Sequence, residues 1–261
     1  MKFALVLVLT AGTVAFGKPD TPRGQLAAPG ASGVVMGHLH LTATDAAASR
    51  TFWTALGAVA IQNGSLQLLQ LPGTFVMVRG GQPAGGTAGS TIDHVTFRVR
   101  DLGASTALWA KSGIVVTAGA ITTADGIVIQ LVGDKALTEP VRMGTVTIAT
   151  VAPEETRAWY ARSFGAEIPG VHLEFTKAAT APAPTKGRAL DHIGFDVKGL
   201  EAFCQKLDAA GVKLDRPYTK LPNSDTAIAF LTDPWGTYIE LTENLAPSGA
   251  PTDAAPGLVS R

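Results

Sequence analysis

The stretch TAGSTIDHVTFRV at residues 87–99 recurs as TKGRALDHIGFDV at residues 185–197. Thr, Gly, Asp, His, Phe and Val stand at the same places in both copies, so that His94 and His192 are 98 positions apart. A second pair lies upstream, because RTFWTALGA at 50–58 resembles RAWYARSFGA at 157–166. Two pairs in the order A-B-A-B indicate that a unit of two modules has been duplicated.

Each of the four modules opens with alternating apolar and polar residues, a pattern typical of a strand with one face against a core. These strands are expected at 37–43, 93–99, 144–150 and 191–197, and helices near 45–56, 101–112, 153–164 and 199–210. Asp45 and Asp101 are suitable N-caps, and Pro153 suits the first turn of the third helix. Short strands complete each unit, and Asp233-Pro-Trp-Gly236 predicts a turn between the last two. The sequence therefore predicts a βαβββ module four times.

The N-terminus carries the pattern of a secretory signal. Lys2 precedes an apolar run that ends at Phe16, and small residues at this end suit cleavage near Gly17. The run is shorter than the ~20 residues of a membrane-spanning helix, although an N-terminal anchor is the alternative. We expect a protein exported to the periplasm or secreted. It would have a signal peptide at 1–17, a spacer at 18–33, domains at 34–138 and 141–245, and a flexible tail at 246–261.

Composition excludes several classes of protein. The 21 Lys and Arg residues balance the 21 Asp and Glu residues, so no basic footprint for nucleic acid or anionic lipid is present. The single cysteine, Cys204, excludes an intramolecular disulfide, and its helical stripe with Leu200, Phe203 and Leu207 favours a buried structural thiol. The chain has no nucleophile elbow, HExxH, phosphate-loop or dinucleotide motif. Composition and motifs thus leave a small-molecule function open.

Four motifs carry a family resemblance: His38-Leu-His-Leu, the helix ending Phe-Trp-Thr-Ala-Leu-Gly57, Asp191-His-Ile-Gly-Phe195, and Asp233-Pro-Trp-Gly-Thr-Tyr-Ile-Glu-Leu241. Together they resemble the vicinal-oxygen-chelate superfamily of glyoxalases, bleomycin-binding proteins and extradiol dioxygenases. The resemblance covers about 34–245 and implies an α+β fold, in which four βαβββ modules form two tandem glyoxalase-like domains with cupped sheets. It does not fix the reaction, because one fold hosts many chemistries.

The resemblance also implies where a divalent metal would bind. In that superfamily the ligands come from the first and the last strand of each module in a cup. The corresponding positions here are His38, Met77, His94 and Gln130 in the N-terminal half, and Thr145, Glu174, His192 and Glu240 in the C-terminal half. The strand alternation independently places His192 and Glu240 opposite the apolar faces of their strands.

Glu174, His192 and Glu240 are predicted as the main metal site, with the two glutamates also as candidate proton-transfer groups. One imidazole and two carboxylates suit Zn, Ni, Mn or Fe(II). Two carboxylates attract a cation strongly, and without the cation their repulsion is expected to raise the pKa of at least one of them. The alternative is a polar, solvent-wetted sheet face that binds no metal.

His38, His94 and Gln130 are predicted as a weak second site, with His40 on the same face as His38. This set carries no negative charge, and a decayed site kept for packing is the alternative. Neither half contains the two-histidine, one-carboxylate set of ring-cleaving dioxygenases, which makes that reaction a less favoured expectation.

The polar segment 215–226 contains Arg216, Tyr218 and Lys220. If it forms a loop at the rim of the second cup, these residues are candidate ligands for an anionic substrate. An ordinary exposed loop is the alternative.

Three functions from different classes remain open. The first is a metal-dependent lyase or isomerase of glyoxalase type, in which the metal would chelate two adjacent oxygens of a small substrate. The second is a metal-free protein that sequesters a small molecule, as bleomycin-binding proteins do. The third is a structural or interaction module. The first is the favoured prediction, and a monomer is compatible with all three.

Overall fold

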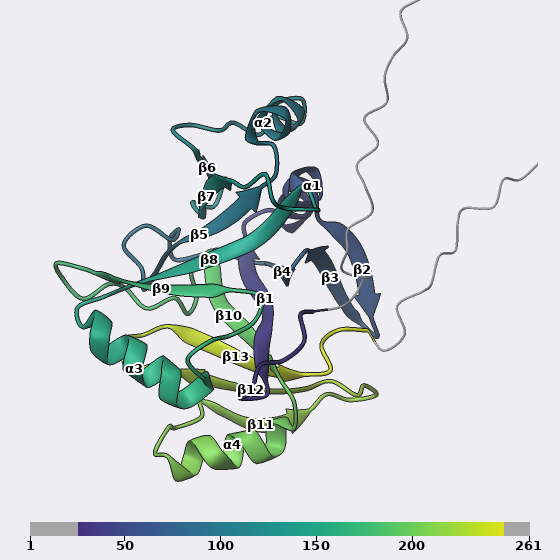
Figure 1. Cartoon of the computed structure of the whole chain (residues 1–261). Helices are drawn as coiled ribbons and strands as arrows, with labels where there is room; N and C mark the ends of the chain where they lie inside the picture. Colours follow the sequence, from purple (N-terminus) through teal and green to yellow (C-terminus); the bar gives the residue numbers. More distant parts are fainter. Residues whose placement is uncertain (1–25, 248–261) are drawn as a thin grey trace, which may run out of the picture.

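The computed structural model describes residues 26–247, which form two mixed β-sheets and four α-helices (Figure 1). The helices are α1 (Ala46–Leu56), α2 (Leu102–Ala110), α3 (Pro153–Phe164) and α4 (Leu200–Ala209). The predicted signal at 1–17, residues 18–25 of the spacer and residues 248–261 of the tail lie outside the described residues. Within 26–247, no helix has the length and apolar character that a membrane crossing requires.

The larger sheet has eight strands in the order β11-β12-β13-β10-β1-β4-β3-β2. They are β1 (Val34–Ala43), β2 (Val59–Asn63), β3 (Leu66–Leu71), β4 (Thr74–Gly80), β10 (Leu190–Val197), β11 (Arg216–Lys220), β12 (Ala227–Thr232) and β13 (Tyr238–Glu243). Its centre is the antiparallel pair β1–β10, in which His40 is the partner of His192. A strand of the first module and a strand of the fourth module therefore meet in the middle of one sheet.

The smaller sheet has five strands in the order β6-β7-β5-β8-β9. They are β5 (Ile92–Val99), β6 (Ala120–Thr122), β7 (Val128–Gly133), β8 (Val141–Thr150) and β9 (His172–Lys177). Its central pair β5–β8 is antiparallel and joins His94 to Thr147, in the same way that β1–β10 joins His40 to His192. The two sheets are thus built on the same plan.

The α+β class and the two cupped sheets are confirmed, but only two modules have all four predicted strands. The first and fourth modules are complete, with β1–β4 and β10–β13. The second has three strands and the third has only β8 and β9, where 178–189 runs directly into β10. Gly-, Pro- and Thr-rich residues such as those at 179–187 favour turns over strands, which explains the missing hairpin.

The expected assignment of one cup to each half of the chain is corrected by the strand pairing. Each sheet takes one module from each half: the first module pairs with the fourth, and the second with the third. The sequence repeat reveals which modules are alike, but the hydrogen bonds between β1 and β10 decide which modules share a sheet. The boundaries 34–138 and 141–245 therefore separate repeats of sequence, and neither repeat builds a sheet alone.

One hydrophobic core joins the helix-covered faces of both sheets. Trp53 on α1 contacts Phe97 on β5 at a ring-centroid distance of 6.0 Å, and Phe164 on α3 contacts Phe195 on β10 at 5.1 Å. Cys204 lies in this core, as the sequence predicts. The side chains of His and Glu on β1, β10 and β13 point the other way, onto the concave face of the larger sheet.

Local signals set the ends of the helices as predicted. The carboxylate of Asp45 accepts hydrogen bonds from the backbone N–H groups of Ala47 and Ala48, which caps α1. Asp101 caps α2 in the same way, through the N–H of Ala104. The predicted turn before β13 is closed by the N–H of Gly236, which donates to the carbonyl of Asp233 over 3.1 Å.

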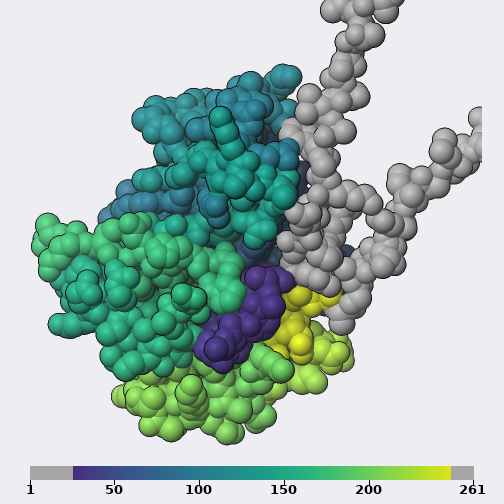
Figure 2. All heavy atoms as spheres, viewed as in Figure 1, coloured from purple at the N-terminus to yellow at the C-terminus, as the bar shows by residue number. Residues whose placement is uncertain are grey.

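Figure 2 shows the first described residues, in purple, against the last strands, in yellow. Leu26 and Leu245 belong to a small second apolar cluster, separate from the main core. Phe75 and Met77 of this cluster are the strand partners of His38 and His40, so the cluster lies on the concave face of the larger sheet, beside these two histidines.

Candidate metal centre

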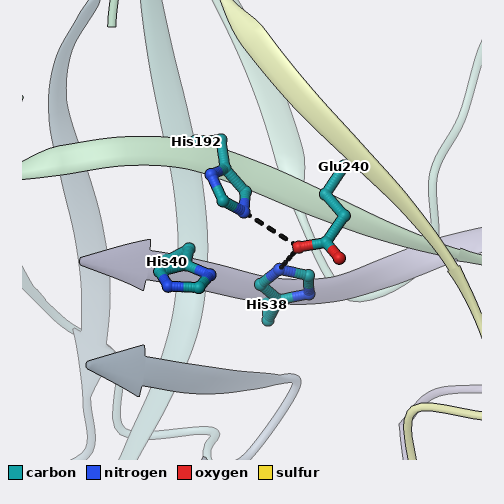
Figure 3. Close-up of side chains that lie close together, drawn as sticks. All are labelled: His38, His40, His192 and Glu240. Carbon is teal, nitrogen blue, oxygen red and sulfur yellow. Dashed lines mark hydrogen bonds and ion pairs between the residues drawn. The ribbon is translucent and has the colours of Figure 1, made fainter. Parts of the chain in front are cut away.

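Four side chains from three strands converge on the concave face of the larger sheet (Figure 3). His38 and His40 come from β1, His192 from β10 and Glu240 from β13. One ligand atom from each of the four lies within 4.8 Å of the others, which makes this cluster a candidate metal centre. His38, His192 and Glu240 are buried, and His40 is partly exposed.

One carboxylate oxygen lies between two imidazoles. Oε2 of Glu240 is 3.0 Å from Nε2 of His38 and 2.9 Å from Nε2 of His192. Two atoms bound to one cation at about 2.1 Å, and at a right angle to each other, are about 3 Å apart. Each of the two nitrogens therefore lies at the distance from Oε2 of Glu240 that neighbouring ligands of one cation have.

A second carboxylate holds His192 in place. Nδ1 of His192 donates to Oδ1 of Asp191 over 2.6 Å, which turns Nε2 toward Glu240. Asp191 is itself fixed through Oδ2, which accepts from Arg79 at 2.8 Å and from the N–H of Gly187 at 2.7 Å. A carboxylate behind a histidine is the usual support of a metal-binding imidazole.

The imidazole of His38 needs a glycine beneath it. A Cβ atom added to Gly194 on β10 would overlap the Cε1, Nδ1 and Nε2 atoms of His38. Gly194 is the strand partner of both His38 and Glu240. The missing side chain at position 194 is therefore what allows His38 to reach Glu240 across β10.

The carboxylate of Glu240 and the imidazole of His192 each shift the pKa of the other toward its charged form. Burial alone would raise the pKa of Glu240, but hydrogen bonds from His192 and His38 together hold it well below its ordinary value. Burial likewise opposes a charge on His192, yet Asp191 and Glu240 raise the pKa of its imidazole. Burial, followed by the nearby His192 and His38, lowers the pKa of His40 to about 3. Glu240 is thus ionised and His40 neutral near pH 7.

The donors fit a divalent cation. Two imidazole nitrogens and one carboxylate oxygen suit Zn, Ni, Mn or Fe(II), and His40 offers a third imidazole nearby. Nδ1 of His38 and Nδ1 of His40 are buried and have no hydrogen-bond partner within residues 26–247. Because unpaired buried polar atoms are costly, such atoms are typical of sites with a function beyond stability.

The structure brings some of the predicted ligand positions together and separates others. His192 and Glu240 lie together as predicted, and their other partner is His38 rather than Glu174. Met77, the fourth position in this sheet, belongs to the small apolar cluster and offers no charged donor. Because Glu174 is absent here, the predicted repulsion with Glu240 does not occur, and the pKa of Glu240 is lowered rather than raised.

The smaller sheet holds the remaining predicted ligands. Nδ1 of His94 bonds Asp93 at 2.7 Å, as His192 bonds Asp191, while Nε2 of His94 lies 3.1 Å from the hydroxyl of Thr147. The same hydroxyl lies 3.1 Å from Oε2 of Glu174. Strand pairing makes Thr147 the counterpart of His40, so this centre has a hydroxyl where the larger sheet has an imidazole.

Gln130 and Thr145 flank this second centre on neighbouring strands, where each is a partner of Thr96. Gln130 and Glu174 are exposed. His38, which the sequence grouped with His94 and Gln130, lies in the other sheet. The predicted second set is therefore divided between the two concave faces.

The predicted substrate segment forms a strand in its first part. Arg216, Tyr218 and Lys220 belong to β11, and an irregular register between Arg216 and Thr219 changes which face each side chain takes. Arg216 pairs with Phe230 next to the metal centre, whereas Tyr218 packs against the main core and Lys220 is exposed. Of the three, Arg216 alone lies in the row of residues that contains Glu240.

Two residues near the centre were missed by sequence reasoning. Phe230 and Tyr238 stack at a centroid distance of 5.3 Å, and each makes a T-shaped contact with the His192 ring. The strand alternation places Tyr238 on the face of Glu240, which is the sequence signal that could have identified it.

The comparisons with known proteins agree with this architecture. Residues 142–241 match the model of the Glyoxalase/Bleomycin resistance protein/Dioxygenase superfamily. A relative from Vibrio cholerae serotype O1, named "Probable lactoylglutathione lyase", is 35% identical over 81 residues. That match covers 31% of this chain, and the chain spans only 59% of the length of this relative.

The likeness of fold extends over most of the chain. The crystal structure of glyoxalase I from Zea mays superposes with a TM-score of 0.64 and covers 81% of this chain and 92% of its own. The sequences are 16% identical, so this comparison concerns the fold alone. Residues 142–241 are thus similar to the Glyoxalase/Bleomycin resistance protein/Dioxygenase superfamily, and most of the chain shares the fold of glyoxalase I.

Proposed function

We propose that this protein is a divalent-metal enzyme that binds a small substrate through two adjacent oxygens and shifts a proton within it. The observation that carries the proposal is the cluster of His38, His192 and Glu240, in which both imidazole Nε2 atoms lie 2.9–3.0 Å from one carboxylate oxygen on a buried sheet face. The reaction class is that of a lyase or isomerase of glyoxalase type. The relative named lactoylglutathione lyase supports this choice.

The roles of the residues follow from their positions. His38, His192 and Glu240 would hold the cation, and Asp191 would keep His192 oriented. The bound cation would polarise the substrate oxygens and make a neighbouring C–H group more acidic. His40 is the proton-transfer group in this proposal, because it is partly exposed and makes no hydrogen bond to the other three residues.

This assignment replaces Glu174 by His40 in the proton-transfer role. Glu174 lies in the other sheet, bonded to Thr147. Glu240 is already shared by two imidazoles, so its oxygen is committed to binding. The imidazole of His40 is neutral near pH 7 and can accept a proton, but its pKa of about 3 makes it a weak base, so the transfer depends on strong polarisation of the C–H group.

The test combines metal content with activity. Purified protein should contain one divalent ion per chain and should form lactoylglutathione from methylglyoxal and glutathione or act on a related dicarbonyl adduct. His40→Ala should keep its metal and lose activity, whereas Glu240→Gln should lose both. A wild-type protein that binds no divalent ion but is stabilised by a small ligand would instead support the metal-free sequestration function.

A second candidate function is favoured by the same three side chains. Two histidines and one carboxylate form the facial triad of non-haem Fe(II) oxygenases. The sequence shows this set in neither half, but the pairing of β1 with β10 assembles it across the halves. Oxygen consumption after anaerobic loading with Fe(II), compared with loading with Zn, Ni or Mn, distinguishes the two functions.

Export is also proposed, on the signal pattern at 1–17. N-terminal sequencing of secreted or periplasmic protein should begin near Lys18. Intact Met1 on a cytoplasmic protein would contradict this proposal.

A further inference from the structure

The concave face of the larger sheet is apolar on one side of the metal centre. Strands β2, β3 and β4 contribute a cluster that is separate from the main core and consists of Ile61, Leu66, Leu68, Phe75 and Met77. Leu68 and Phe75 are at most 1% exposed. This side of the cup is therefore already filled.

The apolar side begins directly beside two of the metal-centre histidines. On the parallel pair β1–β4, Phe75 is the partner of His38 and Met77 is the partner of His40. Neighbouring strands are about 4.8 Å apart, so paired residues on one face are in lateral contact range. A substrate bound at the centre would meet Phe75 and Met77 if it extended in this direction.

The apolar cluster is covered by residues from both ends of the described chain. Leu245 is 1% exposed and joins Leu68 and Phe75 in the cluster, while Leu26 packs against it from the other end of the described chain. Figure 2 shows these two ends of the described chain in contact on the surface. Leu245 thus covers the apolar side of the cup from above.

Three hydrogen bonds hold the segment Asn244–Leu245, which covers the apolar cluster. The N–H of Leu245 donates to Oδ2 of Asp196 over 3.0 Å. Nδ2 of Asn63 donates to the carbonyls of Asn244 at 3.2 Å and Leu245 at 2.9 Å. The segment is therefore tied to β10 on one side and to β2 on the other, across the concave face.

The opposite side of the centre presents a different surface. Phe230 and Tyr238 are half-buried and stacked, and Lys186 lies 4.3 Å from the centre of the Tyr238 ring. Phe230 pairs with both Glu240 and Arg216. Two half-buried aromatic rings, with Lys186 over one and Arg216 paired with the other, thus lie on the side of β12 and β13.

We propose that Leu245 is a specificity-determining residue, which closes the apolar side of the cup and directs the body of the substrate onto Phe230 and Tyr238. The inference rests on the proposed function for the position of the substrate headgroup. Its physical basis is that Leu245 packs in one cluster with Phe75, the strand partner of His38, and with Met77, the strand partner of His40. Shortening this side chain opens that space to an alkyl group.

The test uses alkyl hydroxamates, which present two adjacent oxygens to a metal and carry tails of chosen length. In the metal-loaded wild type, octanohydroxamate should bind no more than about threefold more tightly than acetohydroxamate, because its tail finds no pocket. In Leu245→Ala the ratio should rise to at least about tenfold. Asn63→Ala, which unties the segment without altering Leu245, should raise the ratio in the same direction.

Leu207→Ala is the matched control, because Leu207 is 2% exposed in the main core and lies on α4. It creates a cavity of the same kind away from the cup and should leave the ratio at the wild-type value. An unchanged ratio in both Leu245→Ala and Asn63→Ala would overturn the proposal. An equal rise in Leu207→Ala would overturn it as well, because general loosening would then be the cause.

A metal-independent measurement separates this inference from the proposed function. Without metal, the apolar dye anilinonaphthalene sulfonate should fluoresce more strongly with Leu245→Ala and Asn63→Ala than with the wild type or Leu207→Ala. If no hydroxamate binds the metal-treated wild type, the proposed function fails, and the dye then decides whether Leu245 covers the cup. No gain in dye fluorescence would refute the covering role.

Discussion

Nε2 of His38 lies 3.0 Å from Oε2 of Glu240, although 202 positions separate the two residues in the sequence. The contact joins the first strand of the first module to the last strand of the fourth. It exists because β1 and β13 lie on either side of β10 in the larger sheet. The candidate metal centre is therefore a product of the way the modules pair.

Gly194→Ala should displace His38 and weaken metal binding. The added Cβ atom would overlap the imidazole of His38, so the ring must leave its place beside Glu240. Loss of one ligand from the proper geometry should lower metal affinity at least about tenfold. Isothermal titration with Zn or Ni measures the change. Gly103→Ala on α2 is the control, since a Cβ there meets only an oxygen of Asp101 at an ordinary contact distance of 3.6 Å, and metal affinity should not change.

Asp191→Asn should weaken metal binding by about 10- to 100-fold, because an amide orients the imidazole of His192 less strongly than a carboxylate does. Asp93→Asn is the matched control. Asp93 holds His94 in the same manner in the smaller sheet, so its substitution should leave the affinity of the main centre within about twofold. Equal losses in the two variants would show that orientation of His192 is not the cause.

Asp196 should make the stability of the folded protein depend on pH. Burial raises the pKa of Asp196 to about 6, against the partial opposition of the N–H of Leu245. A carboxyl group whose folded pKa is raised binds its proton more tightly in the folded state. Its contribution to stability is therefore full below pH 4 and is lost as the pH rises to about 6.

Asp196→Asn should remove the loss of folding stability that occurs as the pH rises to about 6. By denaturant unfolding, the variant should gain stability relative to the wild type between pH 4 and pH 7, by up to about 3 kcal/mol. Asp225→Asn, at an exposed carboxylate, is the control and should leave the profile unchanged. Parallel profiles for Asp196→Asn and the wild type would contradict the buried, raised pKa.

Tyr160→Phe should destabilise the fold by about 1–3 kcal/mol, because it removes a hydrogen bond to a buried carboxylate. The hydroxyl of Tyr160 on α3 donates to Oδ2 of Asp233 over 2.8 Å and so ties the third module to the fourth. Thermal or denaturant unfolding measures the change. Tyr218→Phe is the control, since the hydroxyl of Tyr218 makes no hydrogen bond within the described chain. If Tyr160→Phe lowers the free energy of unfolding by less than Tyr218→Phe does, the hydrogen bond between Tyr160 and Asp233 does not stabilise the fold.

Much of the fold is predictable from local signals. The alternation at Leu190–Val197 places His192 on one face, and Asp45 and Asp101 mark the starts of α1 and α2, as the structure confirms. The internal repeat correctly predicts that His94 and His192 take equivalent places in two similar sheets. These features depend on residues close together in sequence.

The composition of the metal centre could not be predicted in the same way. His38, His192 and Glu240 are all among the predicted ligand positions, but their grouping depends on whether β1 pairs with a strand of its own half or with β10. Both pairings bury similar apolar faces, so the repeat leaves the choice open. The irregular register at Arg216–Thr219, which turns Tyr218 into the core, is likewise set by pairing with β12.

The most direct test of the account compares the metal content of His38→Ala and His94→Ala, purified in parallel with the wild type. The two histidines lie in different sheets, and only His38 contacts Glu240. The account predicts about one divalent ion per chain in the wild type and in His94→Ala, and almost none in His38→Ala. A His94→Ala protein that loses its metal, beside a His38→Ala protein that keeps it, would contradict the assignment of the centre to the larger sheet.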